Sequence, residues 1–370
     1  MSSKKDKTKS INNYYMGLAL ALARENAGLT KENPSVGCVL VKNNQIISTG
    51  ITSINGRPHA EYNAVKNSVD NVSGSTAYVT MEPCTHKGKT DPCSSLLIKS
   101  KIKKVYFSVT DIDERTSNKA LKVFKRKGIV VKKGILKREV KNFYSNYFFN
   151  RKHKLPYITG KIACSKDNYI KSNKSQYISN QESLNVTHLL RYRNDGILVS
   201  YKTINADNPK LNCRLPGLEN FSPKIFIIDR NLRTKNSSYV LNCISRRNTF
   251  IFHNSNKLKK IKYLKKKGIK LIKIKDENIE KFDPYKIVKE IYKNKVYTLL
   301  VEGGFDITKS FLKKNFFNQF YLFKSNNSLK SNGSIKISDI FSGLNRNFKN
   351  KKMLDTYSNK DKIIRYFNYV

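Results

Sequence analysis

Two short stretches decide how this sequence folds: residues 58–61 read P-H-A-E, and residues 83–93 read P-C-T-H-K-G-K-T-D-P-C. Zinc is bound tetrahedrally by thiolate and imidazole ligands, and a catalytic zinc site leaves one position open for water. Three ligands of these types are present at His59, Cys84 and Cys93. The pattern therefore predicts a zinc site with an open fourth position.

Glu61 stands two residues after the histidine, close enough to reach a water at the open position without being a ligand. A histidine, a glutamate two residues later and a Pro-Cys…Cys pair together indicate a zinc deaminase, in which the glutamate is the general acid/base. The competing interpretation is a closed structural zinc, for which His86 is the nearby candidate as fourth ligand. That interpretation leaves Glu61 without a role.

Composition sets the frame for this site. The chain has 370 residues, enough for two domains, and 39% of them are hydrophobic, enough for real cores. It contains no uninterrupted apolar run of membrane-helix length and no signal-peptide pattern after its basic start, so we expect a cytoplasmic protein without a membrane partner. Of its six cysteines only Cys84 and Cys93 have ligand-like spacing, and no disulfide framework is expected.

The net charge of +45 would by itself suggest nucleic acid as a partner. The positive residues are spread over the whole chain instead of forming one stripe with interleaved aromatic residues, so nucleic acid is not the expected partner. A zinc-stabilised nucleic-acid-binding protein remains the alternative of a different class. A positive field also suits phosphorylated small substrates.

The order of apolar runs predicts two α/β domains. In the first, the sequence predicts a helix from Tyr14, a strand hairpin at 36–49, helices that begin at His59 and Cys93, and strands at 77–80 and 104–109. This is a three-layer α/β/α unit. We expect residues 1–11 to be disordered, 12–149 to form the zinc-dependent domain and 150–370 to form a second α/β domain with a mostly parallel sheet. The Asn-, Ser- and Lys-rich tail after Phe323 predicts short strands at best.

The first half resembles the deaminase half of the bifunctional riboflavin-biosynthesis deaminase–reductases. The resemblance rests on N-P-S-V-G-C-V-L-V at 33–41, on P-H-A-E, and on the eight residues between the cysteines, T-H-K-G-K-T-D-P at 85–92. It implies a cytidine-deaminase-like fold. It also implies that His86, Lys89 and Thr90 line the pocket of a phosphorylated pyrimidine nucleotide. Asn33, in a turn before the first strand, is of a type that can hold a ribose or a base edge.

The resemblance continues into the reductase half of the same family. It rests on K-I-A-C-S-K-D-N at 161–168, S-Q-Y-I at 175–178, S-Y-K-T-I-N-A-D-N-P-K-L at 200–211 and V-E-G-G at 301–304. Asn168 stands where the family has glycine, and the family's usual turn after Phe323 is missing. The resemblance implies a dihydrofolate-reductase-like fold, which agrees with the absence of a GxGxxG motif.

The family also implies which residues act in this half. Expected on the NADPH side are Ala163, Tyr177, Thr203, Asp207, Gly304, Phe305, Asp306, Ile307, Thr308, Lys309 and Ser310. Expected on the substrate side are Lys161, Ser175, Arg191, Leu211, Arg214 and Glu302. From the residues alone, Lys161, Arg191 and Arg214 are cations of the kind that a substrate phosphate needs, and the turn at Glu302-Gly303-Gly304 could cradle a phosphate with backbone N–H groups.

The expected function is therefore riboflavin biosynthesis in two steps. By resemblance, the first half uses one zinc ion to deaminate 2,5-diamino-6-ribosylamino-4(3H)-pyrimidinone 5′-phosphate by hydrolysis. The second half uses NADPH to reduce the ribosyl chain to ribityl, and the family suggests a homo-oligomer. The alternative within enzymes is a deaminase whose reductase half is only structural.

Overall fold

The computed structural model describes residues 2–173, 178–243, 248–275, 282–354 and 361–368. By its contacts the chain divides into two compact units, residues 1–153 and 154–369, and each is described by itself. The boundary expected at 149/150 lies inside the last helix of the first unit, four residues before the boundary that the contacts give. Among the described residues, no helix is both long and apolar enough to cross a lipid bilayer.

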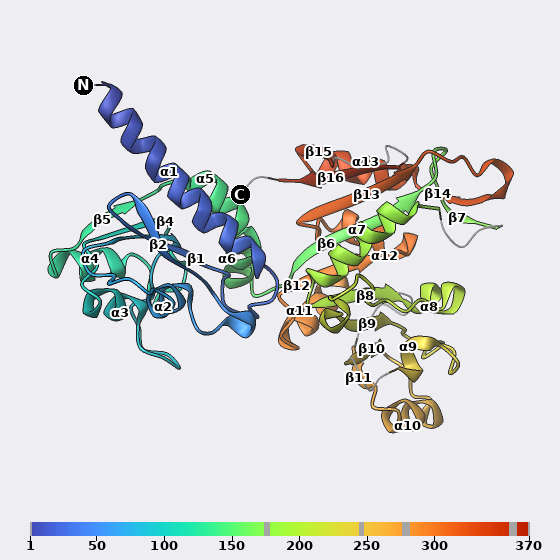
Figure 1. Ribbon diagram of the computed structural model, residues 1–370. Helices are drawn as coiled ribbons and strands as arrows, with labels where there is room; N and C mark the ends of the chain where they lie inside the picture. The colour runs from blue at the N-terminus through green and yellow to red at the C-terminus, as the bar shows by residue number, and fades with distance from the viewer. Residues whose placement is uncertain (1, 174–177, 244–247, 276–281, 355–360, 369–370) are drawn as a thin grey trace. The chain divides into compact units, whose positions relative to one another are not determined.

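The first unit is a sheet between two helical layers (Figure 1). Its helices are α1 (Ser2–Glu25), α2 (Ala60–Lys66), α3 (Cys93–Lys99), α4 (Lys119–Arg126), α5 (Lys137–Phe143) and α6 (Ser145–His153), with the 3-10 helix η1 (Ile54–Gly56). Its strands are β1 (Gly37–Lys42), β2 (Gln45–Ile51), β3 (Thr76–Met81), β4 (Lys104–Val109) and β5 (Val130–Lys133). The strand order is β2-β1-β3-β4-β5, with the β1–β2 hairpin and the β1–β3 pair antiparallel and β3, β4 and β5 parallel.

The alternation of side chains in β1 explains the three layers. Because successive side chains of a strand point to opposite faces, a strand that is apolar at every position must be covered on both sides. Cys38 and Leu40 pack with α2, α3 and α4, whereas Val39 and Val41 pack with α1. The continuous apolar run at the first strand therefore dictates the predicted α/β/α arrangement.

Residues 2–11, which we expected to be disordered, are the first part of α1 in the structure. No proline or glycine interrupts residues 2–16, so the helix can continue toward the N-terminus from its buried part. Ile11 packs against the apolar layer under α1, and the Asn12 side chain accepts a hydrogen bond from the Tyr78 hydroxyl at 2.7 Å. These contacts anchor the helix at Ile11 and Asn12, whereas its apolar pattern predicts a helix only from Tyr14.

The second unit is built on a nine-stranded, mostly parallel sheet with the order β11-β10-β9-β8-β12-β6-β13-β16-β15 and a separate pair, β14-β7. The strands are β6 (Tyr157–Cys164), β7 (Tyr169–Ser172), β8 (Gly196–Ser200), β9 (Lys224–Ile228), β10 (Thr249–His253), β11 (Lys270–Lys273), β12 (Thr298–Glu302), β13 (Gln319–Ser325), β14 (Gly333–Lys336), β15 (Asn350–Leu354) and β16 (Asp361–Phe367). The helices are α7 (Gln181–Tyr192), α8 (Tyr201–Asp207), α9 (Tyr239–Asn242), α10 (Leu258–Lys266), α11 (Pro284–Lys293), α12 (Phe305–Lys313) and α13 (Ser338–Asn347), with the 3-10 helices η2 (Glu219–Phe221) and η4 (Lys330–Asn332).

Both faces of this sheet are covered, as a parallel sheet requires. Side chains of α11, α12 and α13 share one core with Phe226 and Phe252, and side chains of α7 to α10 share the other with Ile227 and Ile251. Because the central strands β9, β8, β12, β6 and β13 are parallel, their carboxyl ends lie at the same edge of the sheet, where polar side chains can meet.

The tail after Phe323 is more ordered than its composition predicts, which corrects the expectation of short strands at best. It forms α13 and the antiparallel strands β16 and β15, with β16 paired along all seven of its residues to β13. Its few apolar residues, such as Ile340, Leu344 and Ile363, are fully buried. Abundant Asn, Ser and Lys on the exposed positions conceal this pattern.

Candidate active sites

The three expected metal ligands come from three neighbouring segment ends. His59 is the residue before α2, Cys93 is the first residue of α3, and Cys84 lies in the loop that follows β3. The position of α2 depends on Gly50 in β2, because a Cβ there would lie 2.1 Å from the carbonyl oxygen of Ala60. The close approach of α2 to the sheet sets His59 over the end of β3.

The donor atoms of these residues have the separations of a tetrahedral metal site. His59 Nδ1 lies 3.7 Å from Cys84 Sγ and 3.4 Å from Cys93 Sγ, and all three donor atoms lie within 4.8 Å of one another. Bond lengths of about 2.3 Å for Zn–S and about 2.0 Å for Zn–N at tetrahedral angles give donor separations of roughly 3.5 Å to 3.8 Å. Two thiols and one imidazole at this spacing fit zinc.

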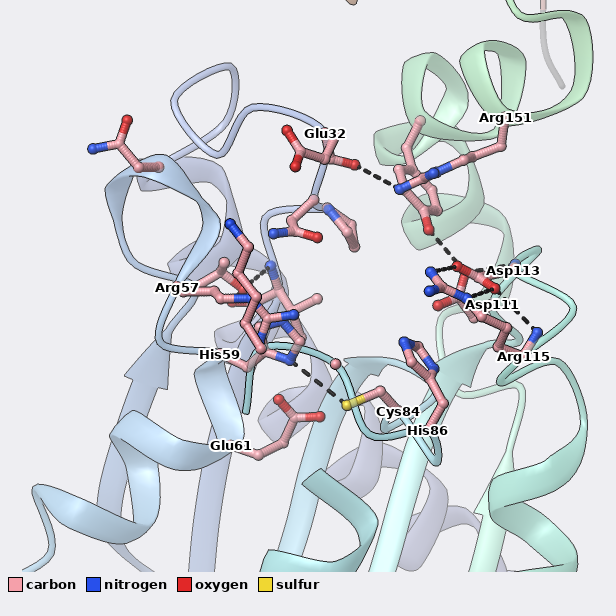
Figure 2. Close-up of a pocket in the computed structure, with 18 residues that line it drawn as sticks. Glu32, Arg57, His59, Glu61, Cys84, His86, Asp111, Asp113, Arg115 and Arg151 are labelled. Carbon is pink, nitrogen blue, oxygen red and sulfur yellow. Dashed lines mark hydrogen bonds and ion pairs between the residues drawn. The ribbon is translucent and has the colours of Figure 1, made fainter. Parts of the chain in front are cut away.

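Glu61 lies in the first turn of α2 and is only 4% exposed; Figure 2 shows it beside Cys84 and His59. Burial raises the pKa of the Glu61 carboxyl, which brings its proton exchange closer to neutral pH. The two thiols titrate as a pair: a hydrogen bond from Cys93 lowers the pKa of Cys84 to about 4, and the same contact raises that of Cys93. A cluster that contains a thiolate at neutral pH carries a negative charge that attracts a metal cation.

His59, Glu61 and Cys84 form the floor of a cavity of about 550 Å³ (Figure 2). Of the residues expected to touch substrate, Asn33, His86 and Lys89 line it. Asn33 donates from Nδ2 to the Gly56 carbonyl at 3.1 Å, which joins the two loops at the cavity rim. Thr90 is not among the lining residues: its hydroxyl accepts a hydrogen bond from Arg57 at 2.6 Å.

His86 is not part of the metal cluster. Its Nδ1 lies 3.0 Å from the Thr116 hydroxyl, and in the described part of the chain the potential metal ligands at this place are His59, Cys84 and Cys93. The closed structural zinc with His86 as fourth ligand is therefore not supported. His59, Cys84 and Glu61 all line the same cavity.

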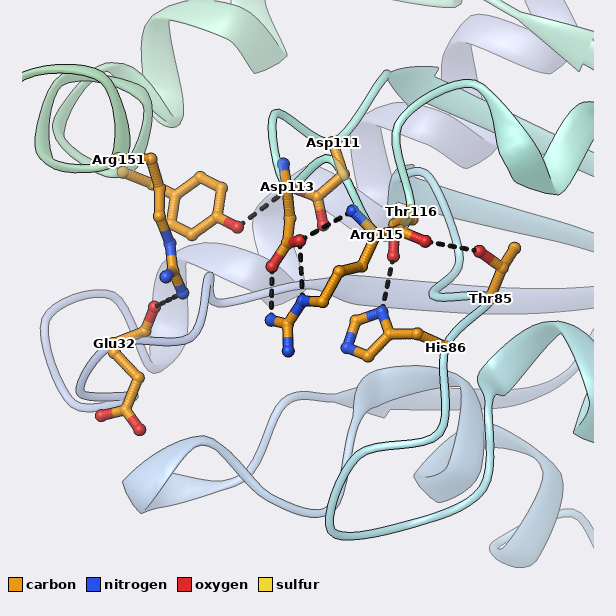
Figure 3. Close-up of polar contacts among 9 residues, drawn as sticks. Glu32, Thr85, His86, Asp111, Asp113, Arg115, Thr116 and Arg151 are labelled. Carbon is orange, nitrogen blue, oxygen red and sulfur yellow. Dashed lines mark hydrogen bonds and ion pairs between the residues drawn. The ribbon is translucent and has the colours of Figure 1, made fainter.

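One wall of the cavity, formed by residues 111–115, Tyr147 and Arg151, was not predicted from the sequence; Figure 3 shows its contacts. Asp113 accepts two hydrogen bonds from the Arg115 guanidinium, at 2.9 Å and 2.6 Å. Asp111 accepts from the Tyr147 hydroxyl at 3.0 Å and from the backbone N–H of Asp113 at 3.0 Å. The Arg151 guanidinium donates to the Glu32 carbonyl at 3.0 Å. No motif marks these residues, because they meet from a loop, α6 and the α1–β1 turn.

Glu82 holds this wall in place from below. Its carboxylate is 3% exposed and accepts three backbone hydrogen bonds, from Asp111 at 3.3 Å and from Asn118 and Ala120 at 3.0 Å each. One side chain at the end of β3 thereby fixes both ends of the loop that carries Asp113 and Arg115. The residue belongs to the E-P-C stretch of the sequence, but nothing in that pattern indicates this role.

In the second unit, the expected substrate residues Arg191 and Glu302 form a buried ion pair. Arg191 donates from Nε at 2.8 Å and from Nη2 at 2.6 Å to the two carboxylate oxygens, and from Nη1 to the Asn212 carbonyl at 3.1 Å. Burial alone would raise the pKa of Glu302, but Arg191 and then Lys161 hold it below its usual value. Burial in turn lowers the pKa of Lys161, whose ammonium lies over the Phe323 ring.

The remaining residues expected on the substrate side are placed differently from one another. Leu211 is buried with a φ of +53°, and Arg214 is exposed and donates to the Asn212 side chain at 3.1 Å. Ser175, like Tyr177 of the expected cofactor side, lies outside the described residues. His188, which was not predicted, shares the Asn212 carbonyl with Arg191 at 3.1 Å.

The expected cofactor segment begins at a turn that only glycine adopts without strain. Gly303 and Gly304 have φ values of +73° and +82°, and a Cβ on Gly304 would lie 3.4 Å from the Thr203 hydroxyl. The open backbone at the start of α12, facing Thr203, is a cradle of the kind that a dinucleotide phosphate occupies. The residues present therefore fit a phosphate group of a dinucleotide.

Side chains of the other expected cofactor residues point in several directions. Ile307 and Thr308 are buried on the inner face of α12, and Phe305 at the start of this helix packs against the core. Ile307 therefore offers a ligand only its backbone. Asp306 pairs with Lys202 at 2.7 Å and Lys309 pairs with Asp339. Further members are the partly buried Ala163 on β6 and Ser310 on α12, and the exposed Asp207 at the end of α8.

Asn168 stands where the family pattern has glycine, and its φ is +70°. Asparagine is one of the few residues that tolerate this left-handed conformation. The substitution therefore preserves the turn between β6 and β7.

Comparison with known proteins gives consistent matches in both units. Residues 9–109 match the model of the cytidine and deoxycytidylate deaminase zinc-binding region, and residues 156–325 match the model of the RibD C-terminal domain. The chain is 34% identical over 317 residues to the riboflavin biosynthesis protein RibD of Aquifex aeolicus, covering 85% of this chain and 87% of that protein. It is 33% identical over 311 residues to the RibD protein of Actinobacillus pleuropneumoniae, covering 84% and 82%.

A solved structure from Thermotoga maritima, described as a diaminohydroxyphosphoribosylaminopyrimidine deaminase/5-amino-6-(5-phosphoribosylamino)uracil reductase, superposes with a TM-score of 0.78. It is 25% identical in sequence, and the match covers 97% of this chain and 99% of that one. The similarity thus spans both units.

Proposed function

Because this chain belongs to the RibD family of riboflavin biosynthesis enzymes, which join a deaminase domain to a reductase domain, we propose a specific pair of reactions for it. The first unit hydrolyses the amino group from 2,5-diamino-6-ribosylamino-4(3H)-pyrimidinone 5′-phosphate and releases ammonia. The second unit reduces the ribosyl chain with NADPH to give 5-amino-6-ribitylaminouracil 5′-phosphate. The observation that carries the proposal is the His59, Cys84 and Cys93 cluster beside the buried Glu61.

In the deaminase, His59, Cys84 and Cys93 would hold the zinc, which when bound lowers the pKa of a water ligand to about 7. Glu61 takes the proton of the attacking water and delivers it first to the ring nitrogen and then to the departing ammonia. The raised pKa of its carboxyl suits this two-way transfer. The enclosed floor of the cavity limits the access of other water to the reacting carbon.

Around this centre, the loops at the cavity mouth orient the rest of the nucleotide. Asp111 and Asp113 offer carboxylate oxygens to the cavity, and sugar hydroxyls donate well to such groups. His86, fixed by Thr116, presents its other ring nitrogen toward the cavity residues. The deaminase unit thereby recognises base and sugar with different side chains.

In the reductase, the Gly303–Gly304 turn and Thr203 would hold the dinucleotide, and NADPH when bound supplies the hydride. The Arg191–Glu302 pair fixes the Asn212 carbonyl and leaves the neighbouring Lys161 ammonium to donate to the sugar chain. The Arg191 charge is already compensated by Glu302 at 2.6 Å, so the exposed Arg214 is better suited to the phosphate of the substrate. The charge of Arg214 has no carboxylate partner in the described part of the chain.

The proposal is tested by supplying the purified protein with the diaminopyrimidine nucleotide and following ammonia and NADPH absorbance separately. We expect one ammonia and one oxidised NADPH per substrate. Ammonia without NADPH oxidation would contradict the reductase half and leave the deaminase. Neither signal would contradict the proposal as a whole and favour the alternative of a zinc-stabilised binding protein.

A further inference from the structure

Arg57 lies at the junction between the metal cluster and the long loop between the two cysteines. It stands two residues before His59, and its side chain crosses to the loop of residues 85–92. Its Nη1 donates to the Thr90 hydroxyl at 2.6 Å, and a Cβ placed on Gly88 would lie 3.2 Å from its Nη2. The absence of a side chain at residue 88 therefore keeps the second edge of the guanidinium accessible. Figure 2 shows Arg57 among the residues that line the cavity together with His59.

The charges of the cavity wall single out the same residue. Arg57 and Lys89 both line the cavity, and neither forms an ion pair with an acidic side chain within the part of the chain that the structure describes. Arg115, by contrast, is neutralised by Asp113 at 2.6 Å. Arg151 donates to the Glu32 carbonyl and stands over the Tyr147 ring at 5.4 Å. Of the lining cations without an acidic side-chain partner in the described residues, Arg57 and Lys89 meet at the loop of residues 85–92, whereas Arg151 lies on α6.

A guanidinium with one edge fixed and one edge free is well suited to a phosphate. Arginine binds phosphate through two parallel N–H···O contacts, and fixing the group beforehand reduces the conformational entropy lost on binding. Lys89, on the adjacent loop, supplies a second positive charge without a fixed geometry. A phosphorylated substrate whose ring lies at Glu61 has its phosphate at the other end of the sugar, toward the cavity wall.

We propose that Arg57 is the specificity-determining residue that binds the substrate 5′-phosphate in the deaminase cavity and selects the nucleotide over its dephosphorylated nucleoside. The inference rests on the proposed deaminase function and deepens it. The Thr90 contact orients the guanidinium, and the phosphate takes its free edge.

The test compares ammonia release from the diaminopyrimidine nucleotide and from the same compound after phosphatase treatment. In Arg57→Ala we expect kcat/KM for the nucleotide to fall roughly 10- to 100-fold, mainly through KM, because a charge-assisted hydrogen bond is removed. The value for the nucleoside stays within about twofold of wild type on the same argument. Arg57→Lys, which keeps the charge but not the fork, should recover part of the loss. Arg126→Ala, which removes an exposed arginine at the end of α4, is the matched control and should change neither value.

An equal loss for both substrates in Arg57→Ala would overturn the inference, since a residue that only holds the cysteine loop affects both alike. Zinc content, measured on each variant, separates that result from loss of the metal cluster. Wild-type enzyme that releases no ammonia from either compound would instead contradict the proposed function itself. Wild-type enzyme that uses both compounds equally well would overturn the phosphate selection alone.

Discussion

The carboxylate of Glu82 links the segment that carries Cys84 to the loop of residues 110–120, which forms one wall of the cavity. Its replacement by glutamine should loosen that loop. Glu82 accepts backbone N–H groups of Asp111, Asn118 and Ala120 while it is 3% exposed. Glutamine has the same shape but only one acceptor oxygen. Its amide nitrogen must then face at least one of these N–H donors.

The size of the effect follows from those three hydrogen bonds. A buried donor without an acceptor costs about 1–3 kcal/mol, and a hydrogen bond to a charged group contributes about 1.5–3 kcal/mol. Because glutamine can satisfy only one or two of the three N–H donors, Glu82→Gln should destabilise the loop of residues 110–120 by about 2–4 kcal/mol. Because about 1.4 kcal/mol corresponds to tenfold in an equilibrium constant, loop opening should become roughly 30- to 700-fold more frequent.

Hydrogen exchange followed by mass spectrometry on peptides that cover residues 110–121 measures this opening directly. Glu139→Gln, an exposed carboxylate in the first turn of α5, is the matched control and should leave exchange unchanged. We also expect a higher KM for ammonia release, since the loop carries Asp113 and Arg115 into the cavity. Unchanged exchange in these peptides would refute the assigned role of Glu82.

Two further predictions concern the second unit. Arg191→Met leaves Glu302 buried without its partner and should cost about 3–5 kcal/mol at neutral pH. In the wild type the pKa of Glu302 is lower in the folded than in the unfolded protein, so the ion pair stabilises the fold above the unfolded pKa of about 4.3. This contribution is lost as pH falls through the folded pKa. In the variant, burial raises the folded pKa of Glu302 above the unfolded value, so the stability should instead decline as pH rises above about 4.3. Thermal melting at pH 4.5 and pH 8 checks the sign, and Arg191→Met/Glu302→Gln should remove the pH effect. Gly304→Ala forces a side chain into a φ of +82° and toward Thr203. The KM for NADPH should therefore rise roughly 5- to 30-fold, as about 1–2 kcal/mol of strain predicts, with ammonia release unchanged. An unaltered KM for NADPH would argue against the cofactor cradle.

The parts of the first site that are local in sequence could be predicted, and the parts that depend on tertiary contacts could not. His59 and Cys93 begin helices, Cys84 follows a strand, and such positions are legible from apolar periodicity and turn residues. Asp111 and Tyr147 lie 36 residues apart and meet only because α6 packs against the end of the sheet. No spacing rule connects them.

Composition is misleading at both ends of the chain, for the same physical reason. Residues 2–11 and the tail after Phe323 are rich in polar and basic residues, yet the first continue α1 and the second forms α13, β15 and β16. Ile11 and Asn12 hold α1, and Ile363 holds β16 beside β13. Sparse apolar residues in a polar background give a weak periodic signal even where the fold uses each of them.

The reductase side was predicted residue by residue only through family resemblance. The structure unites Arg191, Glu302 and Lys161, and it turns the Ile307 side chain of the expected cofactor segment into the core. Resemblance identifies the segment that faces a ligand. It does not tell which side chains of a helix in that segment reach the ligand.

The measurement that tests the central claim most directly is ammonia release by Glu61→Gln with zinc content determined on the same preparation. The glutamine keeps the size of the side chain but cannot carry the proton. We expect the zinc content to remain near that of wild type, because the ligands are His59, Cys84 and Cys93, while ammonia release falls by roughly 10²- to 10⁴-fold. A variant that keeps its zinc and releases ammonia at the wild-type rate would contradict the account.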